Sequence, residues 1–264
     1  YNWDGRTTDG GAHEVNFVNN YYKPGAAISN TVALTAQHEA VGLGTQRYYF
    51  AGNVMPGYFD ETNQEAGRNI QGSVSYETFV DSPFFESLVM TQSASDAYKL
   101  VLSNVGCTQP VFDDHDIRVV NETLTGTYSI RGSVTGKPGL PDHEQDIGGW
   151  EEYPGYLRAA NWDTDLDGLP NWWEKAHGLD TSSAAGDFSE SNADEDRNGY
   201  TNLEEYLHWM ARPHYFIEMG EIIDIDLSIY SRGFSNNPEY EISDVVNGMA
   251  TLLTDTSIVQ FSPS

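Results

Sequence analysis

The chain has 264 residues, of which 39% are hydrophobic and 12% are aromatic, so it can bury a core and wholesale disorder is excluded. Lysine and arginine number 13 against 40 acidic residues, which gives a net charge of −27. A surface of this sign repels phosphate, so we expect no nucleic-acid partner and no anionic membrane surface. No apolar run approaches the roughly 20 residues of a membrane span, so we expect none.

Residues 1–90 hold two strand-like runs that share one pattern. Phe17 lies at the centre of the first run with Asn20 three residues later, and Phe50 and Asn53 repeat the pattern 33 residues further on. Repeated strand-then-Asn units are typical of stacked parallel coils, in which Asn amides form a ladder. Two copies leave a generic β-sandwich as a nearly equal alternative.

Residues 91–160 begin with an amphipathic helix. Ser93 and Asp96 resemble a capping box at its start, and Gly106 is a typical residue to end it. Its apolar positions fall on one stripe, which we expect to be core: Ala94, Ala97, Tyr98, Val101, Leu102 and Val105.

A Gly- and Pro-rich stretch from Gly126 to Gly155 predicts a loop-like tail after this helix. Within it, Asp142, His143 and Glu144 are a conceivable metal cluster, although a solvated polar turn is the favoured interpretation. Cys107 is the single cysteine, and we expect it to be a small buried hydrophobe.

Two segments, residues 163–174 and 194–205, match the twelve-residue calcium loop of EF-hand proteins at every defining position. Calcium prefers six to eight oxygen ligands, which the loop supplies from positions 1, 3, 5, 7, 9 and 12. Position 7 contributes a main-chain carbonyl and position 6 is a glycine that permits the turn. The predicted ligands are Asp163, Asp165, Asp167, Leu169, Asn171 and Glu174 in the first loop, and Asp194, Asp196, Asn198, Tyr200, Asn202 and Glu205 in the second.

We expect both calcium ions to be structural, because no substrate-facing group accompanies the loops. Repulsion among the loop carboxylates should leave the segment poorly folded without metal, so calcium binding would contribute to folding. His177 and His208 each follow the last loop residue by three positions. Because a hard-oxygen site does not use imidazole, we expect both histidines to pack or to face solvent.

Several further motifs occur in a specific order: Tyr1-Asn2-Trp3, the run 18–25 (Val-Asn-Asn-Tyr-Tyr-Lys-Pro-Gly), the helix 95–106, Asp113, Asp116 and Arg118, and Gly148-Gly149-Trp150. With these motifs and the calcium loops, residues 1–212 resemble the C-terminal part of bacterial secreted pectate lyases, polysaccharide lyase family 1. The resemblance implies a right-handed parallel β-helix and a secreted, extracellular enzyme. It also implies cleavage of uronic-acid polymers by calcium-assisted β-elimination.

In that family a catalytic calcium neutralises the substrate carboxylate while an Arg removes the adjacent proton. The chain has no match to the catalytic Arg motif, so no catalytic residue is assigned. The catalytic calcium and its coils are expected only upstream, and we expect the chain to be a fragment. Arg6, Lys23 and Arg47 are the candidate contacts to an acidic polysaccharide. Activity of the chain itself stays open, and the alternative is a non-catalytic, calcium-stabilised structural or adhesive component of an extracellular assembly.

Residues 213–264 look like the first half of a bacterial cadherin-like or immunoglobulin-like repeat, on the basis of residues 246–253 and 261–263. Three strands are predicted there, within residues 222–229, 249–253 and 258–261. An incomplete sandwich leaves open edges, which would pair with another copy or with further segments of the same chain.

The predicted chain is therefore mainly β and has four regions. Residues 1–90 are the last coils of a right-handed parallel β-helix, and residues 91–160 are a helix and extended tail packing on it. Residues 161–212 are a small α-helical, EF-hand- or dockerin-like calcium module, and residues 213–264 are a partial β-sandwich.

Overall fold

The computed structural model describes residues 1–9, 13–38, 45–108, 112–152, 155, 157–234 and 238–264. Within these ranges the chain forms two compact units, one of Tyr1–Gly106, Asp113–Trp150 and Glu218–Ser264, the other of Cys107–Phe112 and Glu151–Ile217. We call them the first and the second unit. No helix in the described part of the chain is both long enough and apolar enough to cross a membrane.

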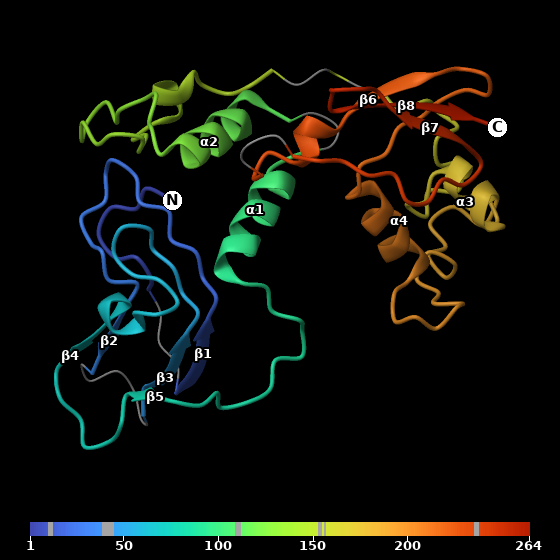
Figure 1. The fold of residues 1–264 in the computed structure, drawn as a ribbon. Helices are drawn as coiled ribbons and strands as arrows, with labels where there is room; N and C mark the ends of the chain where they lie inside the picture. Colours follow the sequence, from blue (N-terminus) through green and yellow to red (C-terminus); the bar gives the residue numbers. More distant parts are fainter. Residues whose placement is uncertain (10–12, 39–44, 109–111, 153–154, 156, 235–237) are drawn as a thin grey trace. The chain divides into compact units, whose positions relative to one another are not determined.

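The regular elements are short and separated by long irregular segments (Figure 1). The strands are β1 (Glu14–Val18), β2 (Leu34–Gln37), β3 (Arg47–Ala51), β4 (Arg68–Gln71), β5 (Phe79–Val80), β6 (Ile223–Asp226), β7 (Gly248–Leu252) and β8 (Ile258–Pro263). The α-helices are α1 (Ala94–Asn104), α2 (Asp114–Thr125), α3 (Asn171–His177) and α4 (Asn202–Met210). Single 3-10 turns are η1 (Gln64–Gly67), η2 (Glu144–Ile147) and η3 (Leu227–Tyr230).

Two parallel sheets lie at the start of the first unit. One has the order β1-β3-β5, and the other pairs β2 with β4 (Figure 1). The 33-residue spacing seen in the sequence sets the register, because Phe17 of β1 lies opposite Phe50 of β3. Their rings stack with centroids 5.4 Å apart, so the repeat places like side chains next to each other.

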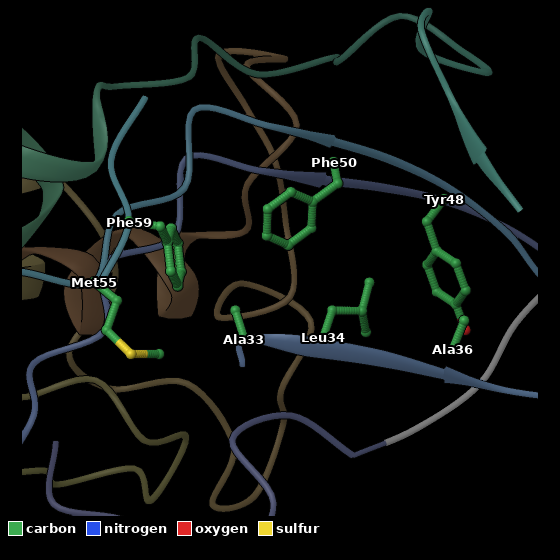
Figure 2. Packing of buried hydrophobic residues seen from close by; sticks show 7 residues of the cluster. All are labelled: Ala33, Leu34, Ala36, Tyr48, Phe50, Met55 and Phe59. Atoms are coloured by element: carbon green, nitrogen blue, oxygen red, sulfur yellow. The ribbon is translucent and has the colours of Figure 1, made fainter. Parts of the chain in front are cut away.

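The core of the first unit lies between these two sheets. Burial alternates along β3, where Tyr48 and Phe50 are buried, and along β2, where Leu34 and Ala36 are buried. Figure 2 shows the rings of Tyr48 and Phe50 on the side of the β2 side chains, with Met55 and Phe59 at one end of the cluster. This period of two is what a strand with one face in a core requires.

Asn53 lies just after β3 and is fully buried. Its Oδ1 accepts hydrogen bonds from the main-chain nitrogen of Asn20 at 2.9 Å and from the Asn20 Nδ2 at 2.8 Å. Its own Nδ2 donates to the carbonyl of Phe17 at 2.9 Å. The predicted ladder of Asn amides is therefore confirmed at this corner.

We expect Asn53→Ala to lower the free energy of unfolding by about 1–3 kcal/mol, because it leaves buried donors and acceptors without partners. Urea unfolding followed by circular dichroism measures this. The matched control is Asn63→Ala, since Asn63 is exposed and its side chain forms no cap hydrogen bond. Equal stability of the two variants would contradict the structural role of the ladder.

The predicted parallel β-helix is wrong. The parallel strands form two separate sheets of three and two strands, and β5 is only two residues long. A stacked-coil fold needs about three or more full repeats to bury a continuous core, whereas the Phe–Asn unit occurs twice. The mainly β class is wrong as well, because helices and irregular segments make up most of the described chain.

Helix α1 begins at the predicted residue. Ser93 is the N-cap, and its Oγ accepts a hydrogen bond from the main-chain nitrogen of Asp96 at 3.1 Å. The predicted core stripe is only partly right, since Val101 and Val105 are 57% and 41% exposed. Cys107 is also exposed, so its predicted burial is wrong.

Helix α2 is a helix that the sequence analysis does not predict. Asp113 is its N-cap and accepts from the main-chain nitrogen of Asp116 at 2.8 Å, and Gly126 ends it with φ of 69°. Arg118 bonds to the buried Glu122 one turn later, at 3.2 Å. The Asp-x-x-Asp-x-Arg motif therefore serves helix capping and an internal ion pair here.

The last strands form one antiparallel sheet of order β6-β8-β7. The strands lie where the alternating residues predict them. The partial β-sandwich is nevertheless a wrong prediction, because no second sheet covers this one among the residues that the structure describes. Three short strands supply too little apolar surface for two layers.

Candidate metal centre

The two predicted calcium loops, both in the second unit, adopt the same backbone turn. At loop position 4, Leu166 and Arg197 have φ of 60° and 59°, and at position 6, Gly168 and Gly199 have φ of 99° and 95°. Left-handed φ is uncommon for residues other than glycine. Its occurrence at the same position in both loops indicates that loop bonding imposes the turn.

Side chains at the first loop position hold this turn in both copies. The Oδ2 of Asp163 accepts from the main-chain nitrogen of Gly168 at 3.1 Å, and Asp194 does the same with Gly199 at 3.1 Å. Asp163 also accepts from the nitrogen of Leu166 at 2.7 Å. The repeat in sequence is therefore a repeat in geometry.

Five carboxylates converge on the first loop. Oxygens of Asp163, Asp165 and Asp167 lie within 4.8 Å of one another, and so do oxygens of Asp167, Glu174 and Glu190. Asp165, Asp167 and Glu174 are 3%, 2% and 0% exposed. One oxygen of Asp165, one oxygen of Asp167 and both oxygens of Glu174 have no hydrogen-bond partner in the described structure.

Such an arrangement is costly without a cation, because a buried, unpaired carboxylate loses several kcal/mol of hydration. Burial, and next the charges of Asp165 and Asp167, raise the pKa of Glu174 to about 7. Burial likewise raises the pKa of Asp167. A bound divalent cation would compensate the same charges that these shifts reflect.

Glu190 is the residue of this cluster that sequence analysis misses. It comes from the connection between the loops, outside both twelve-residue segments, and both its oxygens accept from the main-chain nitrogen of Asp180, at 3.2 and 3.0 Å. A template of consecutive positions gives no signal for it. Only the folded connection brings it to Asp167 and Glu174.

The second loop brings only some of its predicted ligands together, at the surface, and no three of its carboxylates form a close group in the described structure. Asn198 Nδ2 donates to Asp196 Oδ2 at 3.0 Å and to Glu205 Oε1 at 2.7 Å. Asp194 and Asp196 are exposed, and Tyr200 is 49% exposed. This loop therefore offers three exposed or partly buried carboxylates and an amide, whereas the first loop offers four carboxylates and is joined by Glu190.

The side chains at the ninth loop positions are both engaged in hydrogen bonds, one within its loop and one to a residue outside it. Asn171 Oδ1 accepts from the main-chain nitrogen of Thr164 at 2.9 Å, and its Nδ2 donates to Thr164 Oγ1 at 2.7 Å. Asn202 Nδ2 donates to the carbonyl of Glu190 at 2.9 Å. Because both amides already have protein partners, an ion in either loop would be reached from this position through water.

The two histidines behave as expected, since both lie against aromatic rings. The His177 ring stacks on Trp173 with centroids 3.8 Å apart, and its Nδ1 lies 2.8 Å from the Trp173 carbonyl. His208 meets the ring of Tyr200 edge-on, with centroids 4.6 Å apart.

An aromatic core joins the loops to their helices. Trp173 of α3 and Tyr206 of α4 are buried together with Leu169, which occupies the seventh position of the first loop. Partly buried side chains pack around them: Trp162, Trp172, Leu179, Leu203, Trp209 and Met210. The main-chain carbonyl of Leu169 is a predicted calcium ligand, and the buried side chain of the same residue anchors it in this core.

The candidate substrate contacts occupy separate places in the first unit. Arg6 pairs with Asp9 at 2.7 Å, and Arg47 pairs with Glu14 at 3.5 Å. Lys23 Nζ lies 5.7 Å from the centre of the Tyr98 ring. Arg6 also lines a cavity of about 520 Å³. No described contact joins any two of the three cations.

The Asp142 segment is a hydrogen-bonded turn. Asp142 Oδ2 accepts from the main-chain nitrogens of Val134 and Thr135 at 2.8 and 2.7 Å. Asp146 Oδ2 accepts from those of Ser133 and Asp142 at 3.0 and 2.8 Å. These bonds lower the pKa of Asp146 to about 2, which fits the polar-turn interpretation.

The depressed pKa of Asp146 predicts how this turn responds to acid. The carboxylate bonds stabilise the turn above the ordinary Asp pKa of 3.8, and that stabilisation is lost as the pH falls through about 2. We expect the Ser133 amide resonance to shift across that range, and Asp146→Asn to abolish the shift. Asp81→Asn, at an exposed site, is the control. A Ser133 titration that survives Asp146→Asn would disprove the assignment.

Comparison of the chain with protein-family models, curated proteins and solved structures finds no match. The resemblance to pectate lyases therefore stays a prediction from motifs, as does lyase activity. The second unit is a small unit with an aromatic core and two acidic loops that share one backbone turn.

Proposed function

We propose that the second unit binds two calcium ions and that these ions are structural. The observation that carries the proposal is the buried carboxylate of Glu174, which is 0% exposed and has no partner for either oxygen in the described structure. It lies within 4.8 Å of the carboxylates of Asp167 and Glu190, and one oxygen each of the buried Asp165 and Asp167 has no partner either in the described structure. A cation at the predicted loop position compensates that charge.

The donor chemistry favours calcium over other metals. Predicted ligands in both loops are oxygens, which suit a hard cation, and the nearby His177 and His208 pack on rings instead. Magnesium requires near-ideal octahedral geometry and keeps several waters. A cluster of five carboxylates, three of them buried, suits the larger and less demanding coordination sphere of calcium.

A structural role follows from how little else holds this unit together. Three apolar side chains are buried in its core, and residues 151–217 carry fourteen acidic and four basic residues. Small domains with little core usually need a metal or another cross-link. We also propose that the chain works outside the cell, as a calcium-stabilised structural or adhesive component of an extracellular assembly would. Extracellular calcium modules bind the ion with Kd of about 10⁻⁴–10⁻³ M.

Isothermal titration calorimetry of the whole chain tests the proposal. We expect two calcium ions to bind per chain and magnesium to bind far more weakly. Glu174→Gln and Glu205→Gln should each remove or weaken one site, while Glu195→Gln, at an exposed position outside the ligand set, should keep both. Calcium binding that none of these substitutions changes would overturn the proposal.

A further inference from the structure

We propose that Glu190 is a ligand of the first calcium ion, supplied by the connection between the two loops and not by the twelve-residue loop itself. The ion would then fasten residues 178–193, a fully described stretch without helix or strand, to the first loop. This inference rests on the proposed calcium binding of the first loop, adds a residue to that site, and requires no ion in the second loop.

The carboxylate of Glu190 lies where one ion can contact it together with loop residues. Carboxylate oxygens of Asp167, Glu174 and Glu190 all lie within 4.8 Å of one another. Calcium holds its oxygen ligands at about 2.3–2.6 Å, so two ligands of one ion lie no more than about 5 Å apart. The three carboxylates therefore meet the distance condition for a shared ion.

Two of these carboxylates are buried without full hydrogen bonding. Glu174 is 0% exposed and Asp167 is 2% exposed, and both oxygens of Glu174 and one of Asp167 have no hydrogen-bond partner in the described structure. Residues 178–193 include no lysine or arginine. None of the ion pairs in the described part of the chain involves Glu174 or Glu190. A bound cation is therefore needed to balance their charge.

The first loop alone leaves calcium at the lower limit of its coordination. Its predicted protein ligands are one oxygen from each of its three aspartates, the carbonyl of Leu169 and both oxygens of Glu174, whereas calcium takes about six to eight oxygens. The side chain of Asn171 is engaged with Thr164. Glu190 supplies a further oxygen and, with it, a fifth carboxylate.

Glu190 can contact an ion and keep its present hydrogen bond. Both of its oxygens accept from a single main-chain nitrogen, that of Asp180, at 3.2 and 3.0 Å. An ionised carboxylate has about four lone-pair sites, so others remain for a cation. The hydrogen bond to Asp180 therefore orients the carboxylate without occupying it.

Further hydrogen bonds join the same connection to the first loop. The main-chain nitrogen of Ser183 donates to Asp165 Oδ2 at 3.0 Å, and that of Gly186 donates to the Asp165 carbonyl at 2.8 Å. An ion that holds Asp165 and Glu190 at once would therefore order the part of the connection that lies between these contacts.

Terbium luminescence tests whether Glu190 contacts the ion. Terbium occupies calcium sites and is excited through nearby tryptophans, here Trp172 and Trp173 of α3, and its emission lifetimes in H₂O and D₂O count its bound waters. Every sample is the whole chain with Glu205→Gln, and terbium stays below one equivalent, so that an ion in the second loop does not contribute. Glu190→Ala should add about one bound water, because water replaces the lost ligand, and should weaken calcium binding on the order of tenfold.

Two further variants separate ligation from other effects. Glu190→Gln loses the charge but keeps an acceptor for the nitrogen of Asp180, so weaker calcium binding in this variant does not come from a lost hydrogen bond. Asp187→Asn is the matched control, because Asp187 is an exposed carboxylate of the same connection and lies outside both acidic groups. It should leave the calcium affinity and the number of bound waters unchanged.

Hydrogen exchange tests whether the ion fastens the connection. In the parent chain, calcium should slow the exchange of the Ser183 and Gly186 amide protons. In Glu190→Gln at saturating calcium this slowing should be lost, while the amide of Gly168, which bonds within the loop, stays protected. Equal slowing in the two chains would show that the connection is ordered without Glu190 and would overturn the fastening.

The outcomes distinguish this inference from the proposed function. A parent chain that binds neither calcium nor terbium overturns the proposed function itself. Binding with the same affinity and the same number of bound waters in Glu190→Ala overturns the role of Glu190 and leaves calcium binding intact. Weaker binding with an unchanged number of bound waters, or an equal loss in Asp187→Asn, assigns the effect to charge at a distance and also overturns ligation by Glu190.

Discussion

Chelation of calcium is expected to unfold the second unit while the first unit stays folded. With calcium present at about 100 times its Kd, each site adds about 2.7 kcal/mol to the free energy of unfolding, and removal of the ions abolishes this. The buried core of the unit is small, and its acidic residues outnumber its basic ones by fourteen to four. We therefore expect loss of α3 and α4 as well as of the loops.

Tryptophan fluorescence measures this unfolding, because four of the six tryptophans lie in the second unit: Trp162, Trp172, Trp173 and Trp209. Emission should move to longer wavelength in excess EGTA and return when calcium is added. Magnesium at the same concentration is the control and should not restore it. A melting curve identical with and without EGTA would refute a structural role for calcium.

Glu174→Gln is expected to change stability in opposite directions with and without calcium. Without the ion at pH 8, the substitution removes a buried negative charge beside Asp165 and Asp167 and supplies amide donors to their unpaired oxygens. Because the calcium-free unit of the wild type is expected to be unfolded, the substitution should shift its folding equilibrium toward the folded state, by on the order of 1–2 kcal/mol. With calcium, the lost ligand should weaken binding at least tenfold, which is about 1.4 kcal/mol.

Glu205→Gln is the matched comparison, because Glu205 holds the twelfth position of the other loop and is only partly buried. It already accepts from Asn198 Nδ2 at 2.7 Å. Its substitution should therefore have little effect without calcium and a destabilising one with calcium. Helix content and tryptophan emission in EGTA measure the effect without calcium, and thermal melting with calcium measures the other. If Glu174→Gln destabilises the chain under both conditions, Glu174 has an ordinary structural role.

Much of the local structure follows from the sequence. The calcium-loop template covers consecutive residues, so the turns at Gly168 and Gly199 and the first-position carboxylates lie as predicted. The start of α1 depends on the hydrogen bond between the Ser93 side chain and the main-chain nitrogen of Asp96, only three residues away. The 33-residue repeat sets the pairing of Phe17 with Phe50 because like strands stack in register. Each of these features depends on short-range bonding or on a repeated pattern.

Other features depend on contacts between distant segments, and the sequence patterns do not contain them. The prediction of a parallel β-helix extended a two-copy repeat beyond its real length, and the stripe of α1 predicted burial for Val101, which is exposed. Glu190 joins the first loop from outside the template.

The sequence by itself therefore determined the two acidic loops, their backbone turns and the residues that bond within each of them. Only the tertiary structure decided that Glu174 is buried without a partner and that Glu190 lies beside it. The physical reason is that burial and long-range proximity depend on how the whole chain packs, whereas a turn depends on the few residues that form it.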